Sequence, residues 1–202
     1  MSDLLRRLTS ARGVSGDEGD IRKVIIDEIT PLVDEVHIDR MGNVIGYKKG
    51  TNPKRKVMLC AHMDEVGFIV SHITPDGYIK VEKVGGIENA VAAGTRVKIG
   101  KRINGVFCMK PIHLSSASEK DTIPTLQNMY IDIGANNKDD ALLYVQLGDS
   151  VTFVNDYAET EKTVISKALD DRLGCLALIN MIRSEQLFDM YFSFVVQEEV
   201  GL

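Results

Sequence analysis

The sequence lacks several features that mark specialised classes of protein. Its 202 residues include no tryptophan, 5 prolines and 3 cysteines. The cysteines are odd in number and far apart, which fits reduced thiols in the cytoplasm better than a disulfide framework. No apolar run reaches the roughly 18 residues that span a bilayer, and the first residues lack the apolar stretch and cleavage site of a signal peptide. We therefore expect a cytoplasmic protein without a membrane partner.

The sequence also lacks a large excess of either charge, with 24 basic and 29 acidic residues. The formal net charge is −5, and this mildly acidic balance argues against nucleic acid as a partner. Because 44% of the residues are hydrophobic, a disordered chain is excluded. The length suits one large domain or two small ones, each with a real core.

The N-terminal part carries helix signals followed by strand signals. Two helices are expected first, the second capped by residues within Ser15–Glu18 and ending before Pro31. Short strands are expected over residues 36–38 and 43–47. The continuous apolar run over residues 57–61 predicts a central strand that is buried on both faces.

The pattern of residue types changes between Val66 and about Val154, where short strand signals alternate with turn signals. Pro75-Asp76-Gly77 and Asn104-Gly105 predict hairpin turns, because Asn and Gly tolerate positive φ. One helix is expected over residues 138–146. This pattern indicates a small β-barrel or sandwich.

Helix and buried-strand signals then return. A helix is expected after Asp171, and residues 190–196 predict a second strongly apolar strand. The simplest account is an α/β domain, residues 1–65 and 161–202, split by an inserted β domain over residues 66–160.

Three polar clusters lie at the ends of these elements: His62 with Asp64, Asp170 with Asp171, and Glu198 with Glu199. Ligands of open α/β sheets bind beyond the carboxyl ends of the strands. Residues i and i+2 of a strand face the same side, so His62 and Asp64 can converge. This arrangement predicts a metal site in which the imidazole is a ligand and a nearby carboxylate orients it.

The two acidic pairs leave alternatives open. Either Asp170 or Asp171 could bridge two ions, while one glutamate of the other pair ligates and its neighbour acts as general base. In the competing interpretation the aspartates cap the following helix and the glutamates are a solvated strand end.

Three stretches carry a resemblance to a known family: residues 61–68 (AHMDEVGF), 167–174 (KALDDRLG) and 197–202 (QEEVGL). Supporting stretches are residues 13–16 (GVSG), 110–114 (KPIHL) and 130–135 (YIDIGA). Together they resemble the dinuclear-metal aminopeptidases that form tetrahedral particles, a family of glutamyl and leucyl aminopeptidases in which some members were labelled endoglucanases. The resemblance covers essentially the whole chain.

The resemblance implies a role for five residues. His62, Asp170 and Glu199 correspond to metal ligands, with Asp170 bridging the two ions. Asp64 corresponds to the acidic residue that orients His62, and Glu198 to the general base. The implied cofactors are two divalent ions, Zn or Co, with Mn also suited.

The resemblance also implies a fold and partners. The expected catalytic domain is a hydrolase-like three-layer α/β/α domain, here incomplete, with an inserted small β-barrel that serves dimerisation. The expected activity is removal of N-terminal residues from peptides. Homo-oligomers from dimers to dodecamers are expected through the β insert.

The sequence departs from the family pattern in its length. The family's last two ligands, an Asp and a His, follow the glutamate pair, whereas this sequence ends at Leu202. His37, His72 and His113 all precede the second motif, so none matches the missing ligand by its order. We therefore expect weak or no peptidase activity from these residues alone.

Two other functions are weighed against the peptidase. The chain could be a non-catalytic assembly module of the same family, which would bind no metal. It could also be a glycoside hydrolase built on its carboxylates, although an imidazole ligand has no role in that mechanism.

Overall fold

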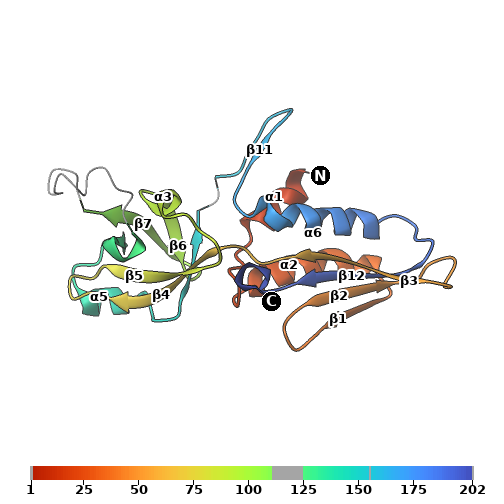
Figure 1. The fold of residues 1–202 in the computed structure, drawn as a ribbon, viewed down its shortest axis with the longest axis horizontal. Helices are drawn as coiled ribbons and strands as arrows, with labels where there is room; N and C mark the ends of the chain where they lie inside the picture. The colour runs from red at the N-terminus through yellow and green to blue at the C-terminus, as the bar shows by residue number, and fades with distance from the viewer. Residues whose placement is uncertain (1, 111–124, 155, 202) are drawn as a thin grey trace. The chain divides into compact units, whose positions relative to one another are not determined.

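The structure, a computed structural model, describes residues 2–110, 125–154 and 156–201. The chain divides into two compact units, one formed by residues 1–65 and 155–202 and the other by residues 66–154. Figure 1 shows both units as ribbons. Within the described ranges, no helix is long and apolar enough to cross a membrane.

The first unit contains a four-stranded mixed sheet. Its strand order is β1-β2-β12-β3, with β12 parallel to β3 and antiparallel to β2. The strands span Glu35–Ile38 (β1), Val44–Lys48 (β2), Lys56–His62 (β3) and Asp189–Val195 (β12). The sequence-predicted strands are thereby confirmed, and Gly42, with a φ of +103°, makes the turn between β1 and β2.

Three helices share one hydrophobic core with this sheet. They span Ser2–Ser10 (α1), Gly19–Ile29 (α2) and Leu169–Ile182 (α6), and a 3₁₀ turn over Thr30–Leu32 carries Pro31. Ile21, Ile25 and Ile29 of α2 are fully buried against it, as the helical spacing predicts. In the sheet, alternate residues of β12 face this core, among them Phe192 and Phe194.

The prediction that β3 is buried on both faces is wrong for this structure. In the described part of the chain β3 pairs only with β12 and lies at the edge of the sheet. Leu59 and Ala61 face the helices, whereas Met58, 54% exposed, and Cys60 lie on the opposite face. A run of apolar residues indicates burial but does not say which other segment provides it.

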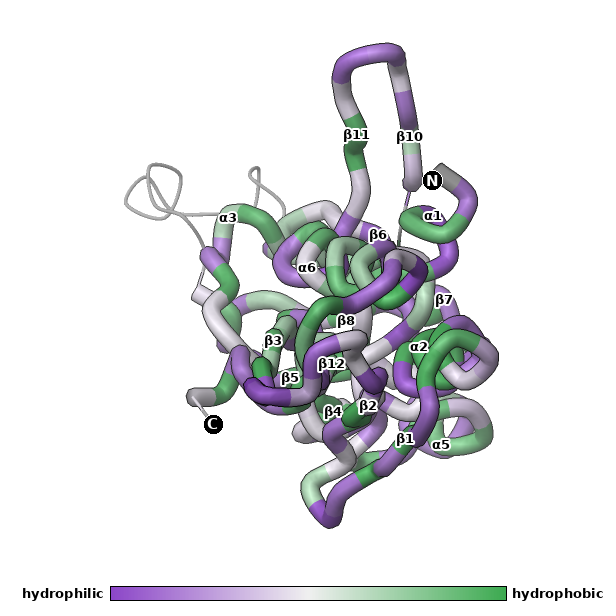
Figure 2. The backbone as a smooth tube through the Cα atoms, turned by 90° about the vertical axis from the view of Figure 1, so that its right-hand side faces the viewer, coloured by the Kyte–Doolittle hydropathy of each residue, from purple (hydrophilic) through white to green (hydrophobic). Residues whose placement is uncertain are grey.

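A short hairpin follows the second unit in the chain. Its strands, Ala158–Glu159 (β10) and Val164–Ile165 (β11), pair only over two residues each. Figure 2 shows that its tip is hydrophilic.

The second unit is a closed six-stranded barrel with the order β4-β5-β8-β7-β6-β9. Its strands are Gly67–Ile73 (β4), Ile79–Val84 (β5), Arg96–Ile99 (β6), Ile103–Met109 (β7), Met129–Asp132 (β8) and Ser150–Phe153 (β9). Short helical segments accompany them at Asn89–Ala92 (α3), Leu126–Asn128 (η3) and Lys138–Leu142 (α5). Phe68 and Phe107 pack against each other in its core in a tilted arrangement, with ring centroids 4.8 Å apart. The chain is therefore a mixed α/β protein. Of the two folds predicted for the inserted unit, barrel or sandwich, the structure shows the barrel.

Two local predictions in the barrel need correction. Asn104 and Gly105 lie inside β7, and the turn before them is formed by residues 100–102, with Gly100 at a φ of +53°. The helix expected over residues 138–146 ends at Leu142. By contrast, the turn at Pro75-Asp76-Gly77 is confirmed, since Gly77 has a φ of +88° between β4 and β5.

Candidate metal centre

The site lies where two parallel neighbouring strands end. His62 is the last residue of β3 and is in register with Val195, the last residue of β12. Glu198 and Glu199 follow β12 in a 3₁₀ turn over Glu198–Val200 (η4). Parallel strands deliver their carboxyl ends to one edge of a sheet, so the first and third sequence motifs meet here.

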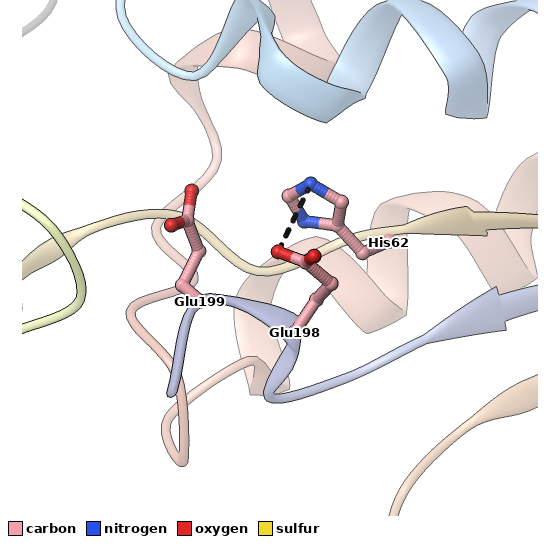
Figure 3. A group of neighbouring side chains, drawn as sticks. All are labelled: His62, Glu198 and Glu199. Atoms are coloured by element: carbon pink, nitrogen blue, oxygen red, sulfur yellow. Dashed lines mark ion pairs between the residues drawn. The ribbon is translucent and has the colours of Figure 1, made fainter. Parts of the chain in front are cut away.

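Three carboxylates surround the imidazole of His62. Its Nε2 lies 3.2 Å from Oδ1 of Asp170 and 3.8 Å from Oε2 of Glu198. Ligand atoms of His62, Glu198 and Glu199 all lie within 4.8 Å of one another. Figure 3 shows both glutamates rising from the turn after β12, with the His62–Glu198 ion pair dashed. The structure therefore brings together all three polar clusters found in the sequence.

Asp64 supports this arrangement from a buried position. Its side chain is 0% exposed, and it accepts hydrogen bonds from the Ser15 hydroxyl at 2.6 Å and from the backbone N–H groups of Glu198 and Glu199 at 3.2 and 3.1 Å. Its Oδ1 lies 3.3 Å from Nδ1 of His62, close enough for an ion pair but not aligned for a hydrogen bond. Asp64 thus ties the turn that carries both glutamates to the histidine.

Ser15 is a residue whose role the sequence did not reveal. The stretch over residues 15–18 predicts a cap for α2. The N-cap residue is Glu18, which makes no side-chain capping hydrogen bond to the helix and accepts from the N–H of Gly16 instead. The Ser15 hydroxyl donates to Asp64 instead. A serine ahead of a helix has the same local signature in both roles, and only the tertiary contact distinguishes them.

The electrostatics of the site follow from these contacts. The interaction with Asp64 raises the pKa of His62 to about 9 against the opposing effect of burial, with Asp170 and Glu198 adding to the rise. Burial favours neutral Asp64, yet its interactions with His62, Ser15 and the two backbone N–H groups lower its pKa to about 2. Burial and the neighbouring carboxylates raise the pKa of Glu199.

The two aspartates at the start of α6 have different surroundings. Oδ1 of Asp171 accepts from the backbone N–H of Gly174, so this residue caps the helix. The Asp170 side chain is 89% exposed and points its Oδ1 at His62. The capping interpretation is therefore borne out for Asp171, while Asp170 is the one of the pair that lies beside His62.

Two residues with left-handed backbone precede the acidic pairs. Ala168 has a φ of +53° and Gln197 a φ of +61°, values that side chains with a Cβ rarely adopt. Neither is a glycine, so no residue type in the sequence signals these turns. Strained backbone of this kind persists where the surrounding structure holds it, and here it directs Asp170 and Glu198 toward His62.

The other histidines have different surroundings. His37 is exposed on β1, and His72 is exposed on β4 of the barrel. His113, with the supporting stretch over residues 111–114, lies outside the described residues, as does Leu202 of the third motif.

The residues present fit a divalent metal ion. One imidazole with several carboxylates suits Zn, Co or Mn. Asp64 beside Nδ1 leaves Nε2 facing the other carboxylates, as in a carboxylate–histidine–metal arrangement. A cation among them would oppose the burial and the carboxylate repulsion that together raise the pKa of Glu199.

A mixed α/β unit with an imidazole and carboxylates gathered at its strand ends has the chemistry of a divalent-metal protein. The family comparison makes this specific: residues 42–202 match the model of the M42 glutamyl aminopeptidase family. The chain belongs to this family.

Two named relatives agree with this assignment. A candidate aminopeptidase of Acetivibrio thermocellus is 42% identical over 204 residues, covering 100% of this chain and 60% of the relative. The lysyl aminopeptidase of Pyrococcus furiosus is 34% identical over 213 residues, covering 99% of this chain and 60% of the relative. The chain therefore spans about three fifths of the length of these relatives.

Solved structures share the fold. The TET aminopeptidase from the archaeon Thaumarchaeota archaeon SCGC AB-539-E09 is 32% identical, with a TM-score of 0.93 over 99% of this chain and 60% of that one. A Pyrococcus horikoshii TET1 peptidase, described as assembling into a tetrahedron or a large octahedral shell, is 33% identical, with a TM-score of 0.88 over 99% and 62%. A Thermotoga maritima protein described as an endoglucanase is 39% identical, with a TM-score of 0.85 over 95% and 58%.

Proposed function

We propose that this chain is part of a divalent-metal-dependent aminopeptidase that removes N-terminal residues from peptides. The observation that supports it most is the imidazole of His62 facing Asp170 and Glu198 at the ends of two parallel strands. Membership of the M42 family and the named aminopeptidase relatives support the same activity.

Each residue of the site has a chemical task in this proposal. His62, Asp170 and Glu199 would hold the metal ions, with Asp170 as the carboxylate that both ions would share. Two bound divalent ions would supply a water of lowered pKa and polarise the scissile carbonyl. Asp64 fixes the ring orientation of His62. Glu198 accepts a proton from the attacking water and returns it to the leaving amine.

A chimera tests the general base. The C-terminal two fifths of the Acetivibrio thermocellus relative are appended to this chain, and hydrolysis of aminoacyl-p-nitroanilides is measured with added Co²⁺ or Zn²⁺. Glu198→Gln should lower kcat by about 10²–10⁴-fold while metal stoichiometry is kept. Glu185→Gln, an exposed residue before β12, is the matched control. An active Glu198→Gln chimera would contradict the assignment.

The same assay on the 202 residues alone tests their incompleteness. We expect weak activity or none, because three protein ligands shared between two ions give each ion fewer contacts than a catalytic zinc usually has. Elemental analysis separates the peptidase from an assembly module: one or two bound ions favour the former, and none favours the latter.

We also propose the finer fold of the complete catalytic domain, a three-layer α/β/α arrangement. The helices α1, α2 and α6 share a core with one face of the sheet, while Met58 and Cys60 are exposed on the other face. In a chain as long as its relatives, further helices would cover this face. The thiol of Cys60 should react rapidly with a disulfide reagent in the 202-residue chain and slowly in the chimera.

The domain limits and the partners belong to the same proposal. The inserted β domain, residues 66–160, would mediate dimers and larger homo-oligomers, and the assembling TET1 relative supports this. Sedimentation of the chimera measures the assembly. The three free thiols, Cys60, Cys108 and Cys175, fit a reducing compartment such as the cytoplasm.

Glycoside hydrolysis is the second candidate, favoured by one observation, the endoglucanase description of the Thermotoga maritima structure. The two-carboxylate mechanism gives His62 no task, although it lies at the centre of this site. A reducing-sugar assay of the chimera on cellulose should therefore show no activity.

A further inference from the structure

A buried charged cluster lies beside the candidate metal centre and is not used by the proposed chemistry. Its members are Glu65, Lys167 and Arg172, whose side chains are 3%, 10% and 0% exposed. The Lys167 ammonium donates to both carboxylate oxygens of Glu65, at 2.6 and 2.5 Å. Nη2 of Arg172 lies 4.0 Å from the same carboxylate.

The cluster is anchored on the N-terminal segment. Nη1 of Arg172 donates to the backbone oxygens of Leu8 and Ala11 at 2.5 and 3.3 Å. The backbone N–H of Gly13 donates to Glu65 at 3.0 Å. A Cβ on Gly13 would lie 2.7 Å from Nη2 of Arg172, so this position leaves room for the guanidinium.

Stability alone is a weak reason for this arrangement. Nε and Nη2 of Arg172 find no hydrogen-bond partner within the described parts of the chain, and burial lowers the pKa of both Lys167 and Arg172 against the opposing effect of Glu65. Apolar residues of similar volume often replace a buried ion pair without loss of stability. Since these charges add little to stability, we look for the reason for the cluster in where its residues lie.

That position relates directly to the metal ligands. Lys167 and Arg172 bracket the segment that contains left-handed Ala168 and non-helical Asp170. Glu65, which holds Lys167, follows Asp64 in the chain, and its backbone N–H donates to the carbonyl of Gly13. The ion pair between Glu65 and Lys167 therefore connects the segment that contains Asp170 to the strand end that contains Asp64.

We propose that Glu65, Lys167 and Arg172 are positioning residues, which clamp residues 167–172 so that Asp170 stays within reach of His62. The proposal rests on the metal site proposed above. It assigns these three residues no contact with substrate or metal.

Co²⁺ titration of the chain, followed by its visible absorption, is the first test. Lys167→Met should weaken Co²⁺ binding by about 10–100-fold, as loss of residues that orient metal ligands typically does. Lys167→Arg should recover most of the affinity. The double variant Glu65→Gln with Lys167→Met removes the carboxylate that Lys167→Met alone would strand, but Arg172 loses the carboxylate 4.0 Å away. Its thermal stability should therefore recover only in part, while its Co²⁺ affinity stays low.

Arg22→Met is the matched control. Arg22 pairs at 3.6 Å with Glu18, another carboxylate that is 3% exposed, in α2 of the same unit. This variant also strands a buried glutamate, but it should leave Co²⁺ affinity unchanged. A purely structural role for Lys167 predicts equal affinities for the double variant and the unmodified chain, and that result would overturn the proposal.

Amide hydrogen exchange of the metal-free chain is the second test and needs no metal binding. Exchange in peptides covering residues 166–173 should accelerate in the double variant and stay unchanged in Arg22→Met. If the unmodified chain binds no Co²⁺, the metal proposal fails, and these exchange rates still decide whether the clamp exists. Unchanged exchange in the double variant would refute it.

Discussion

Asp64 illustrates how one buried carboxylate organises a whole site. It receives the hydroxyl of Ser15 and two backbone N–H groups of the turn after β12, and it lies against His62. Because every donor favours the charged carboxylate, the site keeps a negative charge in its interior. Asp64 therefore connects the motif around His62 to the motif around Glu198, which lies far away in the sequence.

The His62–Asp64 pair predicts a pH dependence for the metal-free chain. The pKa of His62 is raised from 6.5 to about 9, so its contribution to the free energy of unfolding is complete below pH 6.5 and is lost as the pH rises through about 9. The pKa of Asp64 is lowered from 3.8 to about 2, so its contribution is complete above pH 3.8 and is lost as the pH falls through about 2.

Urea unfolding in the presence of a chelator measures this effect. The unmodified chain should exceed His62→Gln in free energy of unfolding most clearly between pH 3.8 and 6.5, with the difference shrinking toward pH 9. His37→Gln, at an exposed position of β1, serves as the control and should show no such trend. A difference that stays constant from pH 6 to 9 would contradict the assigned shift.

At the scale of elements, β7 shows how a glycine can be misread. The Asn104-Gly105 pair predicts a turn, but Gly105 lies within the strand. The position suits glycine because a Cβ there would approach Cγ2 of Ile131 to 2.5 Å. The requirement at this position is close packing against β8, not positive φ. The dipeptide alone carries no information about a neighbouring strand.

Gly105→Ala should therefore destabilise the barrel by about 1–3 kcal/mol through overpacking against Ile131. Gly86→Ala, where a Cβ would meet nothing within 4 Å, should change the free energy of unfolding by less than about 0.5 kcal/mol. Urea denaturation of both variants checks this. Equal effects would indicate that β7 and β8 do not pack as described.

At the scale of the whole molecule, the described residues form two separate hydrophobic cores. One surrounds Phe192 and is shared by the sheet and its helices, and the other surrounds Phe107 inside the barrel. The first core draws on residues from both ends of the chain, with the barrel inserted between them. We therefore expect the two units to respond separately to core mutations.

Phe192→Ala and Phe107→Ala test this separation, since both side chains are at most 1% exposed. Each should cost its own unit about 3–5 kcal/mol. Amide exchange should accelerate in β3, β12 and α6 for Phe192→Ala, and in the barrel strands for Phe107→Ala. Acceleration of both units by either variant would show that they unfold as one.

Local patterns in the sequence were enough to predict most helices and strands and the candidate ligands. Helical spacing placed Ile21, Ile25 and Ile29 on one face, and short strand segments separated by a turn located β1 and β2, because these signals are local. His62, Asp64, Asp170, Glu198 and Glu199 stood out because their residue types suit metal chemistry and lie at element ends. Their resemblance to family motifs added the individual roles.

Only the tertiary structure decided how the carboxylates divide their tasks. Asp171 caps α6 while Asp170 faces His62, although the two are chemically identical neighbours. Ser15, Lys167 and Glu65 became relevant through hydrogen bonds to residues 49 to 102 positions away. Burial, pKa values and left-handed backbone depend on contacts between segments that are distant in the sequence, and no local pattern in the sequence encodes those contacts.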